Sequence, residues 1–156
     1  CSSDIPILSQ IPNLNLYLPG RVEDVEILIK EACSSSHPTY LRLSCHSSSL
    51  SDAELKELKT RPYNDITIFV GETLSYYQRN SDEFEDQKII YVKAMGEPIE
   101  NQLFGAETIT VYEPYSYPIF AHSINFQKPL QAFCYPKSIE TGIFTEPYFI
   151  KNIINR

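Results

Sequence analysis

The stretch that decides the fold runs from Gln10 to Ser44 and reads QIPNLNLYLPGRVEDVEILIKEACSSSHPTYLRLS. Residues Asn13 to Leu18 alternate apolar and polar side chains as a strand does, and Pro19-Gly20 ends the alternation. A helical period follows, and a Ser-rich loop ends it. A second run of strand-forming residues extends from Thr39 to Leu43. A strand, a helix and a strand in this order form the unit from which parallel sheets are built.

The predicted helix begins at Arg21 and is amphipathic. Its apolar stripe, which we expect to face the sheet, comprises Val22, Val25, Leu28, Ile29, Ala32 and Cys33. The side chains that we expect to face solvent are Glu23, Asp24, Lys30 and Glu31. Two strands and one helix cannot cover both faces of a sheet. We therefore expect the face formed by Leu14, Leu16 and Leu41 to be exposed or covered by another chain.

Composition excludes several classes of function. The net charge is -7 with a pI near 4.9, and no run of Lys or Arg offers a surface for a nucleic-acid backbone. No apolar run approaches the roughly 20 residues that span a bilayer. The 156 residues include only 5 glycines, and neither GxGxxG nor GxxxxGK[ST] occurs. A glycine-rich phosphate loop is therefore absent from the sequence.

The four cysteines, Cys1, Cys33, Cys45 and Cys134, are widely spaced and form no CxxC pair. This pattern favours reduced thiols in a cytoplasmic protein. A second interpretation is a lipoprotein with an acylated Cys1, but such proteins continue into a polar tether, whereas patterned structure begins here by Ile5. Because the chain does not open with Met, Cys1 could also mark a truncation point.

Residues 45–64 are rich in Ser, Lys and Glu and predict a linker with one short helix. Ser51 and Glu54 have the spacing of a capping box, so we expect a helix from Asp52 to about Thr60. After it, strands are predicted at Ile66–Gly71, Lys88–Val92, Thr108–Tyr112 and Leu130–Cys134. Helices are predicted over Thr73–Phe84, in a turn at Pro98–Phe104, in part of Tyr115–Ile124 and over Glu146–Ile154. This alternation predicts an α/β fold with an open, mostly parallel sheet.

The first of these pieces resembles the end of the pyrimidine-binding domain of the transketolase family. The order and spacing match without a gap through Gly20, although the family's Arg before Ile-Pro-Asn is absent at Ser9 and Gln10. The residues that carry the match are Asp4, Ile5, Leu8, Ile11, Pro12, Asn13, Leu14, Pro19, Glu23, Pro38 and Arg42.

The second piece resembles the C-terminal domain of the same family. The matching segments are ITIFVGE, MGEPIE, TITVYEP and CYPKSIETG. The resemblance therefore implies three parts: residues 1–44 end a pyrimidine-binding domain, residues 45–64 are the linker, and residues 65–156 form the C-terminal domain.

Members of this family use thiamine diphosphate with Mg²⁺ in ketol transfer. By the resemblance, the glutamate that protonates the cofactor lies upstream of Cys1, and the diphosphate and Mg²⁺ site belongs to another domain. We therefore expect this chain alone to bind neither group and to be inactive. Its role would be dimer assembly and support of the active site, with an upstream segment or partner chain completing the domain in a homo- or heterodimer.

The resemblance implies one substrate-side position within the chain. In many members an Arg three residues after the position of Arg42 binds the substrate's phosphate, and this chain has Cys45 there. Neighbouring His46 could bind an anion only when protonated. Arg42 and His46 are therefore the substrate-side candidates. For Arg42 we prefer a structural role, as an Arg at a strand end paired with a local carboxylate.

A dense aromatic segment, residues 112–120, lies where the family has a glycine-rich helix start. Tyr115, Tyr117 and Phe120 are candidates for a protein-protein contact, with core packing as the other interpretation. Glu113 ends a predicted buried strand, where α/β sites often lie, but the resemblance implies that this domain contributes little chemistry, so Glu113 is interpreted as structural. His37 and His122 have no second His or carboxylate at metal-ligand spacing and are interpreted as structural too. Loss of the glycines, together with Cys45, also favours a rival hypothesis: a non-catalytic interaction module that kept the fold.

Overall fold

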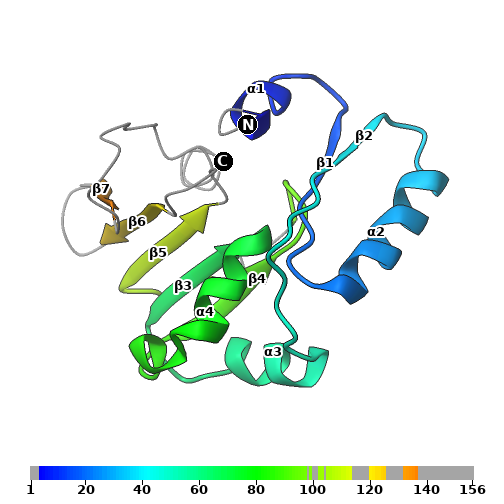
Figure 1. Ribbon diagram of the computed structural model, residues 1–156. Helices are drawn as coiled ribbons and strands as arrows, with labels where there is room; N and C mark the ends of the chain where they lie inside the picture. Colours follow the sequence, from blue (N-terminus) through cyan, green and yellow to red (C-terminus); the bar gives the residue numbers. More distant parts are fainter. Residues whose placement is uncertain are drawn as a thin grey trace.

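The computed structural model describes residues 4–97, 99, 102–103, 105–113, 120–125 and 132–136. It shows an α/β fold with two sheets (Figure 1). The elements are α1 (Asp4–Leu8), β1 (Asn15–Tyr17), α2 (Val22–Ser34), β2 (Thr39–Leu41), α3 (Asp52–Lys59), β3 (Asp65–Val70), η1 (Gly71–Thr73), α4 (Leu74–Arg79), η2 (Ser81–Phe84), β4 (Lys88–Val92), β5 (Thr108–Glu113), β6 (Phe120–Asn125) and β7 (Ala132–Pro136). No helix of the described part has the length and apolarity needed to cross a bilayer.

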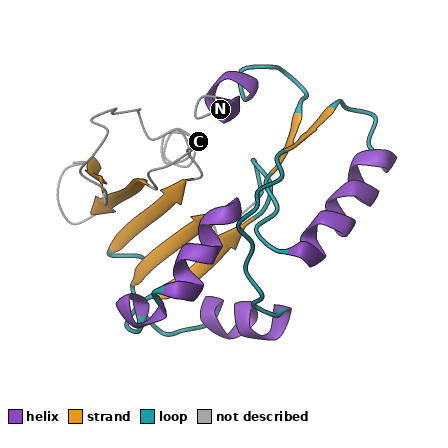
Figure 2. Cartoon of the chain, in the orientation of Figure 1, coloured by secondary structure: helices purple, strands orange, loops and turns teal. Residues whose placement is uncertain are grey.

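The strand, helix and strand predicted at the start of the chain are confirmed. β1 and β2 pair in parallel, with Asn15 opposite Thr39 and Tyr17 opposite Leu41. α2 joins them, as Figure 2 shows. Both strands are shorter than predicted. β1 is limited by Asn13, which has a left-handed backbone with φ 61°, and by Pro19, which follows shortly after its end.

The predicted orientation of α2 is wrong by part of a turn. Asp24, expected in solvent, is completely buried, whereas Val22 and Ile29 are 69% and 45% exposed. Cys33 is exposed as well. The physical reason is that Asp24 binds the buried Arg21, which rotates the helix so that only part of its apolar stripe faces the sheet.

The second sheet has the strand order β4-β3-β5-β6-β7. β3 lies between β4 and β5 and pairs with both in parallel, so Ile66 faces Lys88 on one side and Ile109 on the other. The three strands predicted here are confirmed. The helix predicted over Thr73–Phe84 is divided into η1, α4 and η2, with a break at Asn80.

The end of this sheet corrects another prediction. Residues 120–125, expected to be partly helical, form strand β6, which runs antiparallel to β5. The reason is visible in the two-residue alternation of FAHSIN, where large side chains occupy every second position. β7 pairs antiparallel with β6 and overlaps the predicted fourth strand. The helix predicted over Glu146–Ile154 lies outside the described residues.

The two sheets share one hydrophobic core, which corrects, for Leu16, the prediction that this face is exposed or covered by another chain. Leu16 and Leu18 are buried in a cluster that includes Ile68, Val70 and Val92 of the second sheet. Backbone hydrogen bonds continue this contact. The N–H of Leu18 donates to the carbonyl of Lys93 at 2.7 Å, and the N–H of Met95 donates to that of Leu16 at 2.9 Å. The chain's own second sheet therefore covers this part of the first.

The opposite face of the second sheet packs against α3, α4 and η2. Its core is aromatic: Phe69 stacks on Tyr112 with ring centroids 4.7 Å apart and meets Phe84 edge-on at 5.3 Å. α3 begins with the predicted capping box, in which Ser51 and Glu54 bond each other's backbone N–H. With both faces covered, β3 has the burial that its continuous apolar sequence predicts.

The close approach of two glycines fixes how the pieces meet. A Cβ atom on Gly20 would lie 2.1 Å from the carbonyl oxygen of Gly71. Gly71 itself has φ 59°, a conformation that other residues adopt at a cost.

We predict that Gly20→Ala destabilises the fold by about 3 kcal/mol, because the added methyl meets a backbone atom that cannot move aside. Gly96→Ala is the control, since its Cβ would meet nothing within 4 Å and only its positive φ costs, about 1 kcal/mol. Urea denaturation measures both. Equal losses would contradict the proposed close contact.

Candidate functional site

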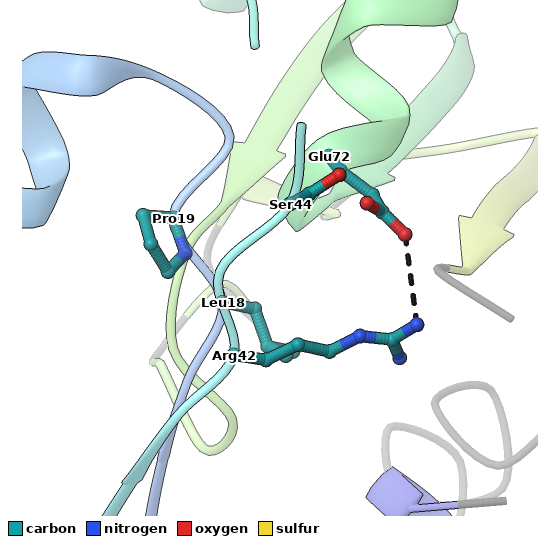
Figure 3. Close-up of a pocket in the computed structure, with 5 residues that line it drawn as sticks. All are labelled: Leu18, Pro19, Arg42, Ser44 and Glu72. Carbon is teal, nitrogen blue, oxygen red and sulfur yellow. Dashed lines mark ion pairs between the residues drawn. The ribbon is translucent and has the colours of Figure 1, made fainter. Parts of the chain in front are cut away.

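The sequence candidate Arg42 lies just after β2, between two carboxylates. Its guanidinium is 3.2 Å from Asp4 and 3.6 Å from Glu72, and Figure 3 shows the side chain extended toward Glu72. All three side chains are largely buried. Arg42 thus pairs with carboxylates, as we preferred, but both partners are distant from it in the sequence and not local.

Three elements bring this group together. Asp4 begins α1, and Glu72 lies in η1, directly after the carboxyl end of β3. The hydroxyl of Tyr40 in β2 donates to Asp4 at 2.9 Å; this hydrogen bond, together with burial, raises the pKa of the Tyr40 phenol. Ligands of α/β sheets bind outside the carboxyl ends of strands, so the position is suitable for a site.

The geometry around Arg42 does not favour an anionic ligand. Two carboxylates already compensate its charge, and the hollow lined by Leu18, Pro19 and Ser44 is too narrow to admit a water molecule. His46 is exposed, does not line this hollow, and follows the exposed Cys45. The substrate-side role of Arg42 and His46 stays a prediction.

The aromatic candidates are only partly within the described structure. Tyr115 and Tyr117 lie outside the described residues. Phe120 begins β6, where its backbone pairs with Glu113 at the end of β5. His122 belongs to the same strand and not to a helix, and His37 is exposed in the loop before β2. The contact role proposed for the aromatic residues stays a prediction.

The most extensive polar arrangement was missed by sequence reasoning. Arg21 is 5% exposed and Asp24 is fully buried, and the guanidinium binds both carboxylate oxygens at 2.8 and 2.9 Å. Arg21 also contacts Asp52 at 2.7 Å and the carbonyl of Leu50 at 3.0 Å. The pair therefore links the start of α2 to α3 and its preceding turn. The i, i+3 spacing of Arg and Asp after Pro-Gly was the available signal.

The second sheet contributes the other partners of Asp24. The hydroxyl of Tyr91 in β4 donates to Asp24 at 2.9 Å and accepts the backbone N–H of Gly20 at 2.6 Å. Lys93, directly after β4, lies 3.3 Å from the same carboxylate. Asp24 thus has three side-chain donors, which satisfies a buried charge that would otherwise be costly.

These contacts set the protonation states. Burial alone would raise the pKa of Asp24, but hydrogen bonds from Arg21 and Tyr91 outweigh it and hold this pKa below the ordinary value of 3.8. Burial, assisted by the charge of Asp24, raises the pKa of Tyr91. The hydrogen bond to Asp24 likewise raises the pKa of Arg21. At neutral pH the group is therefore an ionised pair held by a neutral phenol, which suits a structural role.

Beside this group the surface is hollowed into a cleft of about 270 Å³, which we name the Arg21 cleft; its charged wall residues include Arg21, Asp24, Asp52, Lys56 and Lys93. Within the described part of the chain, no three His, Cys, Asp or Glu side chains are placed to hold a metal ion.

Comparison of the chain with protein-family models, with curated proteins and with solved structures finds no match.

We predict that Asp24→Asn destabilises the protein by about 3–5 kcal/mol, because it leaves Arg21 buried without its main counter-charge. The matched control is Asp52→Asn, which removes an 89% exposed carboxylate from the same arginine and should cost less than about 1 kcal/mol. Denaturant unfolding at pH 7 measures both. Similar losses for the two variants would show that burial of Asp24 does not matter.

The depressed pKa of Asp24 gives the sign of a pH effect. Stability contributed by Asp24 is complete above its unfolded pKa near 3.8 and is lost as the pH falls through the lower folded value. The difference in unfolding free energy between the wild type and Asp24→Asn should therefore be constant from pH 7 to 5 and shrink below about pH 3.8. A difference that grows on acidification would contradict this assignment.

Proposed function

We propose that this chain is the C-terminal portion of a transketolase-like, thiamine-diphosphate-dependent ketol-transfer enzyme or subunit. Its role is dimer assembly and support of an active site built by other segments. The order of elements supports the proposal: a parallel strand-helix-strand unit, a helical linker and a second open sheet. In that sheet four strands, β4, β3, β5 and β7, run in one direction and β6 runs against them.

The observation that carries the proposal is that the first sheet is unfinished. β2 has β1 as its neighbour, and no strand of the described residues pairs with its other edge. Parallel sheets occur almost only with further strands and with both faces covered, so a two-stranded parallel sheet is suited to extension. An open edge also carries unpaired backbone groups, which proteins normally protect.

The helix beside this sheet is incompletely covered too. Val22 and Ile29 are seven residues apart, close to two full turns of α2, so they lie on the same side of the helix, and they are 69% and 45% exposed. Cys33 continues the same line. We infer that the occupant of this surface is another strand-helix segment of the pyrimidine-binding domain, which adds a parallel strand along β2 and packs its helix on Val22 and Ile29.

The cofactor is not expected to bind to these residues. A diphosphate with Mg²⁺ needs carboxylate or amide oxygens around the metal and N–H donors for the phosphates. The sequence lacks a glycine-rich phosphate loop, and the described residues offer no metal-ligand group. The described residues therefore do not fit the group, and no chemical step is assigned to them.

The rival function, a non-catalytic interaction module, is supported by one specific observation. Arg42 is already neutralised by Asp4 and Glu72, and Cys45 stands where the resemblance implies a phosphate-binding Arg. In this case the same unfinished sheet would serve binding alone. The two functions are distinguished by whether the bound partner carries the family's GDG…N cofactor motif and the missing glutamate.

Co-purification with two matched variants tests the proposal. Ile29→Glu places a charge on the proposed contact surface and should abolish recovery of a partner that carries the cofactor motif. Ile27→Glu is the control, because Ile27 is 43% exposed but points to another side of α2. In calorimetry the recovered complex should bind thiamine diphosphate in a Mg²⁺-dependent way, and the isolated chain should not. Recovery unaffected by Ile29→Glu, or Mg²⁺-dependent micromolar binding of the cofactor by the isolated chain, would overturn the proposal.

A further inference from the structure

The Arg21 cleft lies between the start of α2, the outer side of α3 and the residues after β4. Arg21 and Asp24 bind each other beneath it, so these two charges cancel. The ring of Tyr91 lines it as well, with the guanidinium of Arg21 6.0 Å from the ring centroid. Every nitrogen of that guanidinium has a partner, Asp24, Asp52 or the carbonyl of Leu50. This part of the cleft is therefore rigid and close to neutral.

Two lysines on α3 also line the cleft and are not compensated. Lys56 and Lys59 are three residues apart, so they share one face of the helix, and both are exposed. The natural partner of Lys56 would be Asp52, four residues earlier, but Asp52 contacts Arg21 at 2.7 Å. Among the described residues neither lysine forms an ion pair. Because Asp52 pairs with the buried Arg21, it does not compensate the charge of Lys56.

Lys93 adds a third ammonium group to the lining of the cleft. Lys93 is 30% exposed and lies 3.3 Å from Asp24. Glu97 also lines the cleft, and its carboxylate accepts the backbone N–H of Lys93 at 3.2 Å. Counting side chains, the cleft has four cations and three carboxylates, in a protein with a net charge of -7. The local sign is thus opposite to that of the molecule.

We propose that the Arg21 cleft binds a small free anion with several charged oxygens, of the phosphate or diphosphate class. Lysine ammonium groups bind phosphate as compact point charges, and a cleft of about 270 Å³ accommodates a small molecule but no large one. The anion lies between Lys56 and Lys59 on α3 and Lys93 beyond β4. It bridges the linker helix and the second sheet, independently of any catalytic role of the chain.

Titration of the full chain with inorganic pyrophosphate, followed by calorimetry at low ionic strength, tests this site. The wild type should show saturable binding, and the double variant Lys56→Gln/Lys59→Gln should bind at least about tenfold more weakly, since two charge-assisted contacts are lost. Lys30→Gln is the control for net charge, because Lys30 is exposed on α2 and paired with Glu26. Equal weakening by Lys30→Gln, or no saturable binding by the wild type, would overturn the proposal.

A variant with the opposite effect separates binding from folding. Asp52→Asn removes one negative charge from the cleft, so pyrophosphate should bind several-fold more tightly. A damaged fold cannot produce tighter binding. Unchanged or weaker binding by Asp52→Asn would contradict the site, whatever the lysine variants do.

Discussion

The ion pair between Arg21 and Asp24 is the constraint on which the rest of the structure depends. It is buried at the start of α2, and its remaining donors and acceptors come from every neighbouring element: Asp52 from α3, Tyr91 from β4 and Lys93 beyond it. A buried charge is tolerated only when counter-charges and hydrogen bonds compensate it fully. These elements must therefore all pack around the pair. The pair thereby holds the first sheet, the linker helix and the second sheet in one arrangement, and the contact between Gly20 and Gly71 completes it.

Local patterns predicted most of the elements because their causes are local. Alternation in β1, the apolar run of β3 and the capping box of α3 each depend on a few adjacent residues. The face of α2 was not predictable in this way. Val22 and Ile29 are as apolar as Leu28. Which of them are buried depends on the burial of Asp24, whose partners Tyr91 and Lys93 lie 67 and 69 residues away.

The candidate sites also combine features that the local sequence predicts with features that depend on distant residues. That Arg42 would pair with a carboxylate followed from its place at a strand end, but its partners, Asp4 and Glu72, lie far away in the chain. The cover of Leu16 was predicted wrongly for a related reason: the two sheets were treated as separate, whereas their apolar faces meet in one core. Tertiary contacts between distant segments, and not local propensity, determine both results.

The account's central claim is that β2 is an inner strand of a larger sheet. The N–H of Arg42 donates to Tyr17 of β1, so by alternation the N–H of Leu41 points to the open edge. Amide hydrogen exchange at Leu41, measured in the isolated chain and in the purified complex, tests the claim most directly. We predict rapid exchange alone and exchange at least about tenfold slower in the complex, where a further strand bonds this edge, while Arg42 is protected in both. Equal exchange at Leu41 in the two samples would contradict it.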